Sequence, residues 1–208
     1  MITDGMDVDI SWCSKEDTKN VITNCVKMAK LITHSISFAK DGARNLYFFQ
    51  SGVYRDRGEL AIEEMYRKYL ILFNDEDKWQ SRMIDQLIRY IGGDIPEILD
   101  RPVVNRINLL NGIYDIYKSE DTAFEPSSPE YLTTIQIPIN YNPNCQCPHW
   151  DKFLEDVFPE GVQLLQEIIG LCMIPLTSIQ KCIVLLGEGS DGFLYFCKKS
   201  IHFIILFI

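Results

Sequence analysis

The sequence predicts an α+β fold in which helical pairs pack with short antiparallel β-hairpins. Two stretches, residues 62–73 and 79–91, carry apolar side chains at the spacing of an amphipathic helix. Residues 107–141 have a β-like pattern instead. There, Asn111-Gly112 favours the type I′ turn of a hairpin, and isoleucines alternate with polar residues over 135–139. This order of elements is typical of the α+β class.

Further elements are expected on both sides of these stretches. An N-terminal helix is expected from Ser14 to Ile36, followed by strands at 46–49 and 53–54 around a Ser51-Gly52 turn. Later elements are a helix from Pro148 through Phe158, a helix ending at Gly170 and a buried strand at 183–186. The order of all these elements predicts three parts of the chain: an N-terminal helical extension (1–43), a main domain (44–180) and a final segment (181–208).

The net charge and the distribution of charged residues along the chain limit where nucleic acid could bind. The net charge of -9 argues against a protein that coats nucleic acid, since phosphate binding needs clustered Lys and Arg. Residues 115–167 hold ten acids and two bases, whereas residues 44–106 hold ten bases and eleven acids. DNA contacts are therefore expected from Arg44, Arg55, Arg57, Arg82 and Arg89, unless these arginines only pair with neighbouring acids. Trp79 is expected in the core, with nucleotide stacking as the alternative.

The cysteines indicate a cytoplasmic protein with reduced thiols. Seven is an odd number without the spacing of a disulfide framework, and no signal peptide is visible. The apolar tail 201–208 is too short to cross a bilayer, so no membrane association is expected. Cys145, Cys147 and His149 could begin a zinc site, but zinc needs four ligands, so a turn packed by cysteines is favoured. We predict no metal site and no catalytic residue.

Four motifs occur in the same order as in the DNA primase-helicases of phages, plasmids and large viruses such as poxviruses. Residues 108–115 (Asn-Leu-Leu-Asn-Gly-Ile-Tyr-Asp) resemble the signature L-x-N-x-x-N-G-x-x-D of that family. Residues 141–154 resemble its Y-x-P-x-A-x-C-P-x-F/W-x-x-F-L element, and the helix ending at Gly170 is similar to its L-Q-E-x-x-G-Y element. Residues 180–192 resemble the strand and first half of its ATP-binding loop.

The resemblance covers about residues 44–192 and implies a part in viral or proviral DNA replication. In the family, this region precedes a hexameric superfamily 3 helicase domain that uses ATP and Mg²⁺. Expected partners are DNA and other replication proteins, in the cytoplasm or at a host replication site. The fold is then expected to end in the first strand of an incomplete P-loop NTPase domain.

The loop after that strand departs from the family. A working P-loop reads G-x-x-x-x-G-K-[S/T], in which the Lys contacts phosphates and the hydroxyl binds Mg²⁺. This chain retains Gly187, Gly189, Asp191 and Gly192 but continues with Phe193-Leu194, so it is expected to be a truncated fragment without ATPase activity and without a cofactor. The alternative is a stand-alone protein-interaction module with neither DNA nor ATP activity.

Overall fold

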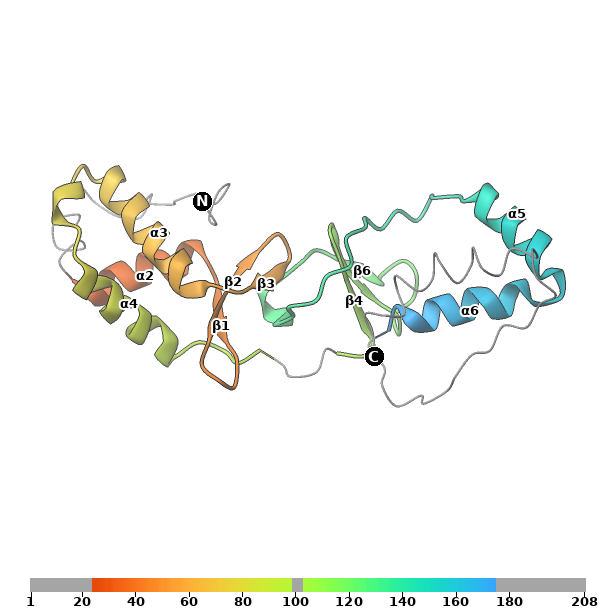
Figure 1. Ribbon diagram of the computed structural model, residues 1–208, viewed down its shortest axis with the longest axis horizontal. Helices are drawn as coiled ribbons and strands as arrows, with labels where there is room; N and C mark the ends of the chain where they lie inside the picture. Colours follow the sequence, from red (N-terminus) through yellow and green to blue (C-terminus); the bar gives the residue numbers. More distant parts are fainter. Residues whose placement is uncertain (1–23, 99–102, 175–208) are drawn as a thin grey trace. The chain divides into compact units, whose positions relative to one another are not determined.

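The computed structural model describes residues 24–98 and 103–174, which form five α-helices and two three-stranded antiparallel sheets. The predicted α+β class is therefore confirmed. The chain divides into two compact units, drawn in Figure 1. We call them the N-terminal unit (residues 1–101 and 126–138) and the C-terminal unit (residues 102–125 and 139–208). No helix in the described ranges has the length and apolar character needed to cross a membrane.

Within the described residues, the N-terminal unit contains three α-helices and a small sheet. In chain order its described elements are α2 Cys25–Ser35, β1 Phe38–Lys40, β2 Leu46–Gln50, β3 Val53–Arg55, α3 Gly58–Leu72, the 3-10 turn η1 Glu76–Lys78, α4 Ser81–Gly93 and, in residues 126–138, the 3-10 turn η2 Pro129–Tyr131. The Asn24 side chain caps α2 by accepting hydrogen bonds from the Val26 and Lys27 amides, at 3.0 and 3.2 Å. The helix start predicted at Ser14 lies outside the described residues. The domain boundaries after residues 43 and 180 remain predictions.

The core of this unit forms where α2, α3 and α4 pack against one another and where α3 and α4 contact strands β2 and β1 (Figure 1). Its fully buried large side chains are Tyr66, Tyr69, Phe48, Met28, Leu31, Ile32, Ile62, Met65, Leu70 and Leu87. The buried Tyr69 hydroxyl is paired, because it donates to the Leu31 carbonyl at 3.0 Å and lies 2.7 Å from the Ser35 hydroxyl. Trp79 is 42% exposed, so the prediction that it belongs to the core is wrong. It lies in the extended link before α4, where its ring is outside the apolar stripe of that helix.

Residues 126–138 return to the N-terminal unit as a strap against the β2–β3 hairpin. The Tyr54 amide donates to the Thr133 carbonyl, and the Tyr54 hydroxyl donates to the Pro129 carbonyl, both at 2.9 Å. Burial raises the pKa of Tyr54 to about 12. The strand predicted over 135–139 is not formed, because the strap makes scattered contacts instead of a ladder. One of them joins the Gln136 side chain to the Ser51 carbonyl at 2.8 Å.

In the part of the C-terminal unit that the structure describes, the second sheet is followed by two helices. Its elements are β4 Arg106–Leu109, β5 Gly112–Asp115, β6 Phe124–Glu125, α5 Pro148–Val157, the 3-10 turn η3 Pro159–Gly161 and α6 Val162–Cys172. The strands pair in the order β4-β5-β6. The small core of α5 and α6 has two buried residues, Leu154 and Leu165, against which Trp150 and Phe158 pack. The helices predicted from Pro148 and up to Gly170 are thereby confirmed within a few residues.

The hairpin turn of this sheet differs by one residue from the prediction. Leu109 pairs with Gly112, so the two-residue loop is Leu110-Asn111 and Gly112 belongs to β5. Among the described glycines, a positive φ occurs at Gly52 (84°), and Ser51 before it also has a positive φ (51°). The predicted Ser51-Gly52 turn is therefore the loop with the backbone of a type I′ turn. At Gly112 a Cβ atom would collide with the Glu125 carbonyl oxygen and with the Phe124 ring, so the glycine permits close approach of β6.

Candidate nucleic-acid interface

The polar residues of the signature at 108–115 stabilise the second sheet. Asn111 faces the backbone of Tyr141, donating to its carbonyl at 2.9 Å and accepting from its amide at 2.8 Å. One side chain thus supplies both a donor and an acceptor, as a neighbouring strand would. The Leu110 amide extends this pairing by donating to the Ile139 carbonyl at 3.0 Å. Asn111 therefore joins residues 139–141 to the hairpin.

Asp115 organises the other end of the hairpin. Its carboxylate accepts hydrogen bonds from the Tyr117 amide at 3.1 Å and from the Asn105 side chain at 3.0 Å, and the Arg106 guanidinium lies 3.7 Å away. The amide hydrogen bond, the Asn105 hydrogen bond and the Arg106 charge hold the pKa of Asp115 below its ordinary value. A depressed pKa and three partners indicate a residue that fixes a turn, since no substrate is needed to explain them.

Three aromatic rings complete this arrangement. The Tyr141 ring centroid lies 5.1 Å from that of Tyr114 on β5 and 5.0 Å from that of Phe124 on β6. These spacings are within the range of favourable aromatic pairs. The signature and the aromatic residue downstream of it thus share one structural role: they hold the β4–β5–β6 sheet and the chain after it in register.

The candidate binding surface lies in the N-terminal unit, in a groove of about 450 Å³ beside the C-terminal end of α4. Arg44, from the turn between β1 and β2, and Arg89, from α4, line it together with Lys40. Glu59 is the acid that also lines the groove. Leu46 and Ile88 contribute apolar lining. The groove therefore combines an excess of positive charge, which favours contact with phosphate, with apolar lining from two residues.

Within the groove, Lys40 differs from the two arginines. Its ammonium donates to the carbonyls of Gly92 and Gly93 at 3.0 and 3.2 Å and so caps the C-terminal end of α4. Arg44 and Arg89 are exposed, and neither forms an ion pair with another described residue. Arg44 has a φ of 67°, so its backbone lies in the left-handed region. The two arginines are the groups available to a ligand.

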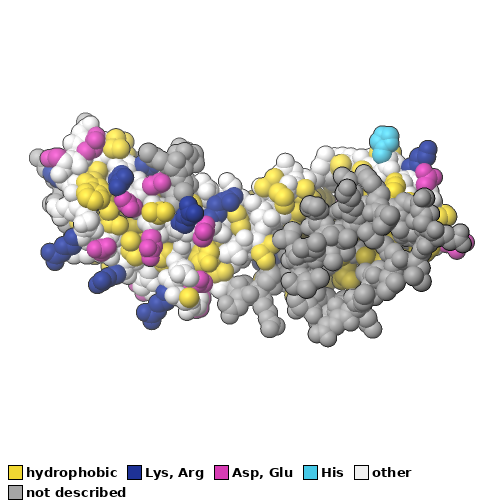
Figure 2. All heavy atoms as spheres, in the orientation of Figure 1, with side chains coloured by type: hydrophobic (Ala, Val, Ile, Leu, Met, Phe, Trp, Pro, Cys, Tyr) yellow, Lys and Arg dark blue, Asp and Glu magenta, His cyan; other side chains and the backbone are white. Residues whose placement is uncertain are grey.

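The fold brings together two of the five arginines expected to contact DNA. Arg55 ends β3, Arg57 precedes the first turn of α3, and Arg82 lies in the first turn of α4. All three are exposed, but they do not line the groove. Figure 2 shows Lys and Arg side chains interspersed with Asp and Glu over the N-terminal unit. Lys40 was missed, because the sequence gives no sign that β1 lies beside the end of α4.

The remaining candidate residues belong to the proposed ATP-binding loop and to the Cys145–His149 turn. Gly187, Gly189, Asp191 and Gly192 lie outside the described residues, so the proposed remnant of the ATP-binding loop stays a prediction. Cys145 and Cys147 are exposed free thiols in the turn before α5, and His149 lies in its first turn. Within the described ranges, no group of three His, Cys, Asp or Glu side chains is arranged to hold a metal ion.

A comparison with protein-family models gives a match over the middle of the chain. Residues 76–159 match the family model described as D5 N terminal like. The matched segment runs from η1 through α4 and the β4–β5–β6 sheet to the end of α5, so it includes Arg89, Asn111 and Asp115. A comparison with curated proteins found none that matches the chain.

Proposed function

We propose that this chain acts in DNA replication as the non-catalytic domain flanking an ATP-dependent helicase, which the match of residues 76–159 to the D5 N terminal like family model supports. Its own task is to contact the DNA backbone through the groove of Arg44 and Arg89. The pattern of motifs over residues 108–192 supports the replication setting. The cytoplasm or a viral replication site within the host cell is the proposed location.

The groove is the observation that carries the DNA contact. Two exposed guanidinium groups from separate elements face one cavity, and Lys40 adds a third positive charge at its wall. Arginine donates to phosphate through a planar fork, which suits it to this contact better than a point charge. Phosphate contacts position a protein on DNA without reading sequence, so the proposed binding is non-specific.

DNA binding is expected to be weak, because two arginines displace few counterions. Each phosphate contact to single-stranded DNA adds about 0.7 to the slope of log affinity against log salt concentration. The acids of the N-terminal unit, among them Glu59 in the groove itself, reduce the local potential further. A domain of this kind guides a strand that other parts of a replication protein bind more tightly.

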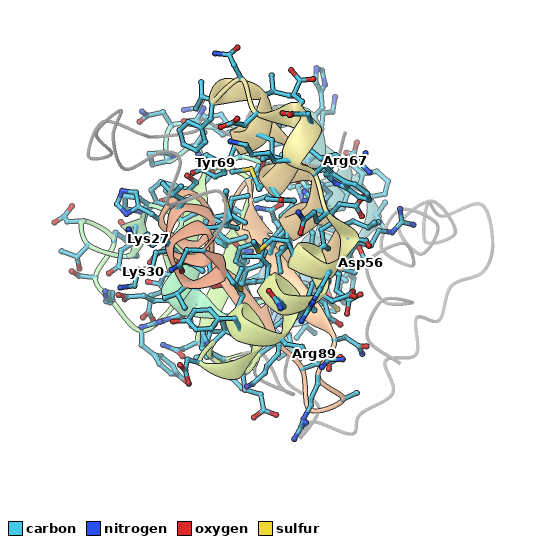
Figure 3. All side chains as sticks on the ribbon, turned by 90° about the vertical axis from the view of Figure 1, so that its left-hand side faces the viewer. Lys27, Lys30, Asp56, Arg67, Tyr69 and Arg89 are labelled. Carbon is cyan, nitrogen blue, oxygen red and sulfur yellow. The ribbon has the colours of Figure 1, made fainter. Side chains whose placement is uncertain are left out.

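A titration of the full chain with a fluorescent single-stranded oligonucleotide, at about 50 and 200 mM salt, tests this proposal. The double variant Arg44→Glu/Arg89→Glu should weaken binding at low salt by roughly tenfold and lower the salt slope by about 1–2. The matched control is Lys27→Glu/Lys30→Glu, which makes the same charge change on the exposed face of α2 (Figure 3). Equal losses in both double variants would mean that overall charge, and not the groove, sets the affinity.

A second candidate function is protein interaction without DNA. It is favoured by apolar side chains that α6 leaves exposed, with Leu164 at 55% and Leu171 at 36%. Helix α6 packs with α5 along one face, and an amphipathic partner helix could cover the exposed face. Gel filtration of the wild type and of Leu164→Glu separates the two functions. A larger species lost in the variant, together with no DNA binding by the wild type, would favour this alternative.

A further inference from the structure

A pocket lies at the opposite end of α4 from the basic groove. It has a volume of about 300 Å³ and is lined by Arg67, Leu70, Ile71, Glu76 and Trp79. The walls are mainly apolar, and Ile71 and Trp79 remain 56% and 42% exposed. Trp79 and Ile71 therefore leave apolar area in water at one wall of the pocket, which a flat ligand could cover.

The Trp79 ring is held in place before any ligand arrives. The Trp79 amide donates to the Glu76 carbonyl at 3.2 Å, which fixes the backbone at the end of η1. The Arg67 guanidinium lies 5.7 Å from the ring centroid, at the distance of a cation–π contact. Arg67 is oriented in turn by Glu63, 2.5 Å away in the preceding turn of α3. A fixed aromatic ring loses little freedom when a second flat ring stacks on it.

The polar groups of the pocket define the ligand further. Glu76 is exposed, and no ion pair among the described residues includes it, whereas its neighbour Asp75 pairs with Lys78 at 2.6 Å. A carboxylate is an acceptor, so it pairs with a ring that carries N–H donors. An unpaired nucleobase has both required features, a flat π face and donors at its edge. Guanine, with adjacent ring N–H and amino donors, fits a carboxylate best.

The position of the pocket agrees with a strand that also enters the groove. Helix α4 has 13 residues and therefore spans roughly 20 Å, with Trp79 before its start and Arg89 near its end. Arg82 and Arg89 are both exposed and lie two turns apart on one face of the helix, with Asp85 and Gln86 between them. Figure 3 places Arg67 and Arg89 on the two different helices, α3 and α4, in separate parts of the unit.

We propose that the pocket of Trp79, Arg67 and Glu76 is a stacking site for one unpaired base of single-stranded DNA whose backbone lies in the Arg44–Arg89 groove. The inference rests on the proposed function, and it narrows the substrate from DNA in general to a single strand. Duplex DNA keeps its bases stacked inside, so it reaches the groove but not the pocket. Trp79 supplies the stacking surface, and Glu76 accepts from the donors at the edge of the base.

The test uses the full chain and a twelve-nucleotide thymidine oligomer carrying one central guanine, a length within the site sizes of roughly 4–16 nucleotides of single-strand binding folds. Tryptophan fluorescence should be quenched on binding, and this quenching should disappear in Trp79→Phe. Trp79→Ala should weaken binding by roughly tenfold, since stacking contributes that order per base. A blunt duplex of the same length should leave the fluorescence unchanged.

Two further variants test the role of the carboxylate. Glu76→Gln should reduce the preference for the guanine oligomer over the all-thymidine oligomer by about fivefold. The matched control, Asp77→Asn, removes the same charge from the next residue, which does not line the pocket, and should keep the preference. Circular dichroism melting curves confirm that each variant is folded, and Trp79→Phe preserves the packing volume best.

The possible failures are distinguishable. Binding that depends on Arg44 and Arg89 but is the same in the Trp79 and Glu76 variants overturns the stacking site and leaves the proposed function intact. A change of oligomeric state in the Trp79 variants, with no change in DNA affinity, assigns the pocket to a protein partner and likewise overturns it. If the wild type binds no oligonucleotide at low salt, both proposals fall.

Discussion

The two units of this chain are stabilised in different ways. The N-terminal unit has one apolar core to which α2, α3, α4 and two strands contribute, whereas the core of α5 and α6 holds two buried residues, Leu154 and Leu165. The β4–β5–β6 sheet is instead fixed by Asn111, Asp115 and three aromatic rings. Where little apolar area is buried, specific polar contacts decide the conformation. Residues 108–115 lie in this second region, and their polar side chains have that structural task.

Core truncation should show the largest difference between the units. Leu87→Ala removes a fully buried side chain from the large core and should lower the free energy of unfolding by about 3–4 kcal/mol. Leu165→Ala should cost less, about 2 kcal/mol, because the small core around it can collapse more easily. Native-state hydrogen exchange of the wild type and both variants measures each unit separately. Equal losses in both variants would contradict the difference between the two cores.

A glycine in the second sheet gives the next effect. Gly112→Ala should destabilise the C-terminal unit by about 1–3 kcal/mol, because the added Cβ atom collides with the Glu125 carbonyl on β6. Gly93→Ala is the matched control, since a Cβ atom there meets nothing within 4 Å. It should leave stability unchanged or raise it slightly.

A third variant tests whether Gly112 is needed for the geometry of the turn or for the close approach of β6. Asparagine tolerates a positive φ, so Gly112→Asn would be harmless if turn geometry were the requirement. Since Gly112 lies in β5 against β6, we expect this variant to be as unstable as Gly112→Ala. Urea unfolding curves of the four proteins measure the differences.

The sequence predicts the long helices of this chain and misses some of its short strands. The helices around Ile62 and Leu87 were predicted, because a helix repeats its pattern over several turns. Strand β1 was missed and a strand at 135–139 was wrongly expected, since strands this short depend on partners distant in sequence. The sequence places Asn111-Gly112 in the turn, whereas Gly112 lies in β5 against β6, which begins twelve residues later at Phe124.

The candidate site was predictable only in part for the same reason. Arg44 and Arg89 were chosen from the local charge balance, which cannot distinguish them from Arg55 and Arg57. Their convergence depends on packing of the β1–β2 turn beside α4, a contact between residues far apart in the chain. Trp79 follows a helical spacing in the sequence, yet α4 begins two residues later and leaves it exposed.

Acid should weaken the second sheet through Asp115. Because its pKa is lowered in the folded state, its contribution to stability is present above about pH 4 and is lost as the pH falls through the folded pKa. Asp115→Asn should therefore lower the melting temperature at neutral pH and approach the wild type near pH 2. Melting curves of both proteins across this range test the sign, and a difference that grows in acid would contradict it.

The smallest expected effect is that of nucleotide. Phe193 and Leu194 stand where a working ATP-binding loop has Lys and Ser/Thr, so we expect no shift of melting temperature with Mg²⁺-ATP and no hydrolysis. A shift of several degrees would reveal a phosphate site elsewhere in the chain. The double variant Phe193→Lys/Leu194→Thr should not restore hydrolysis. Phosphoryl transfer also needs an acid that holds Mg²⁺ and residues that position water and stabilise the transition state.

The strap at 126–138 has a consequence for folding during synthesis on the ribosome. Tyr54 finds its partners at Pro129 and Thr133, so the N-terminal unit is not continuous in the chain: residues 102–125 of the other unit interrupt it. A ribosome that has released residue 101 has not yet supplied those partners. The β2–β3 hairpin can pair by itself, but the two hydrogen bonds of Tyr54 to the strap can form only after residues 102–125 have emerged. The N-terminal unit is therefore completed only after part of the other unit has been synthesised.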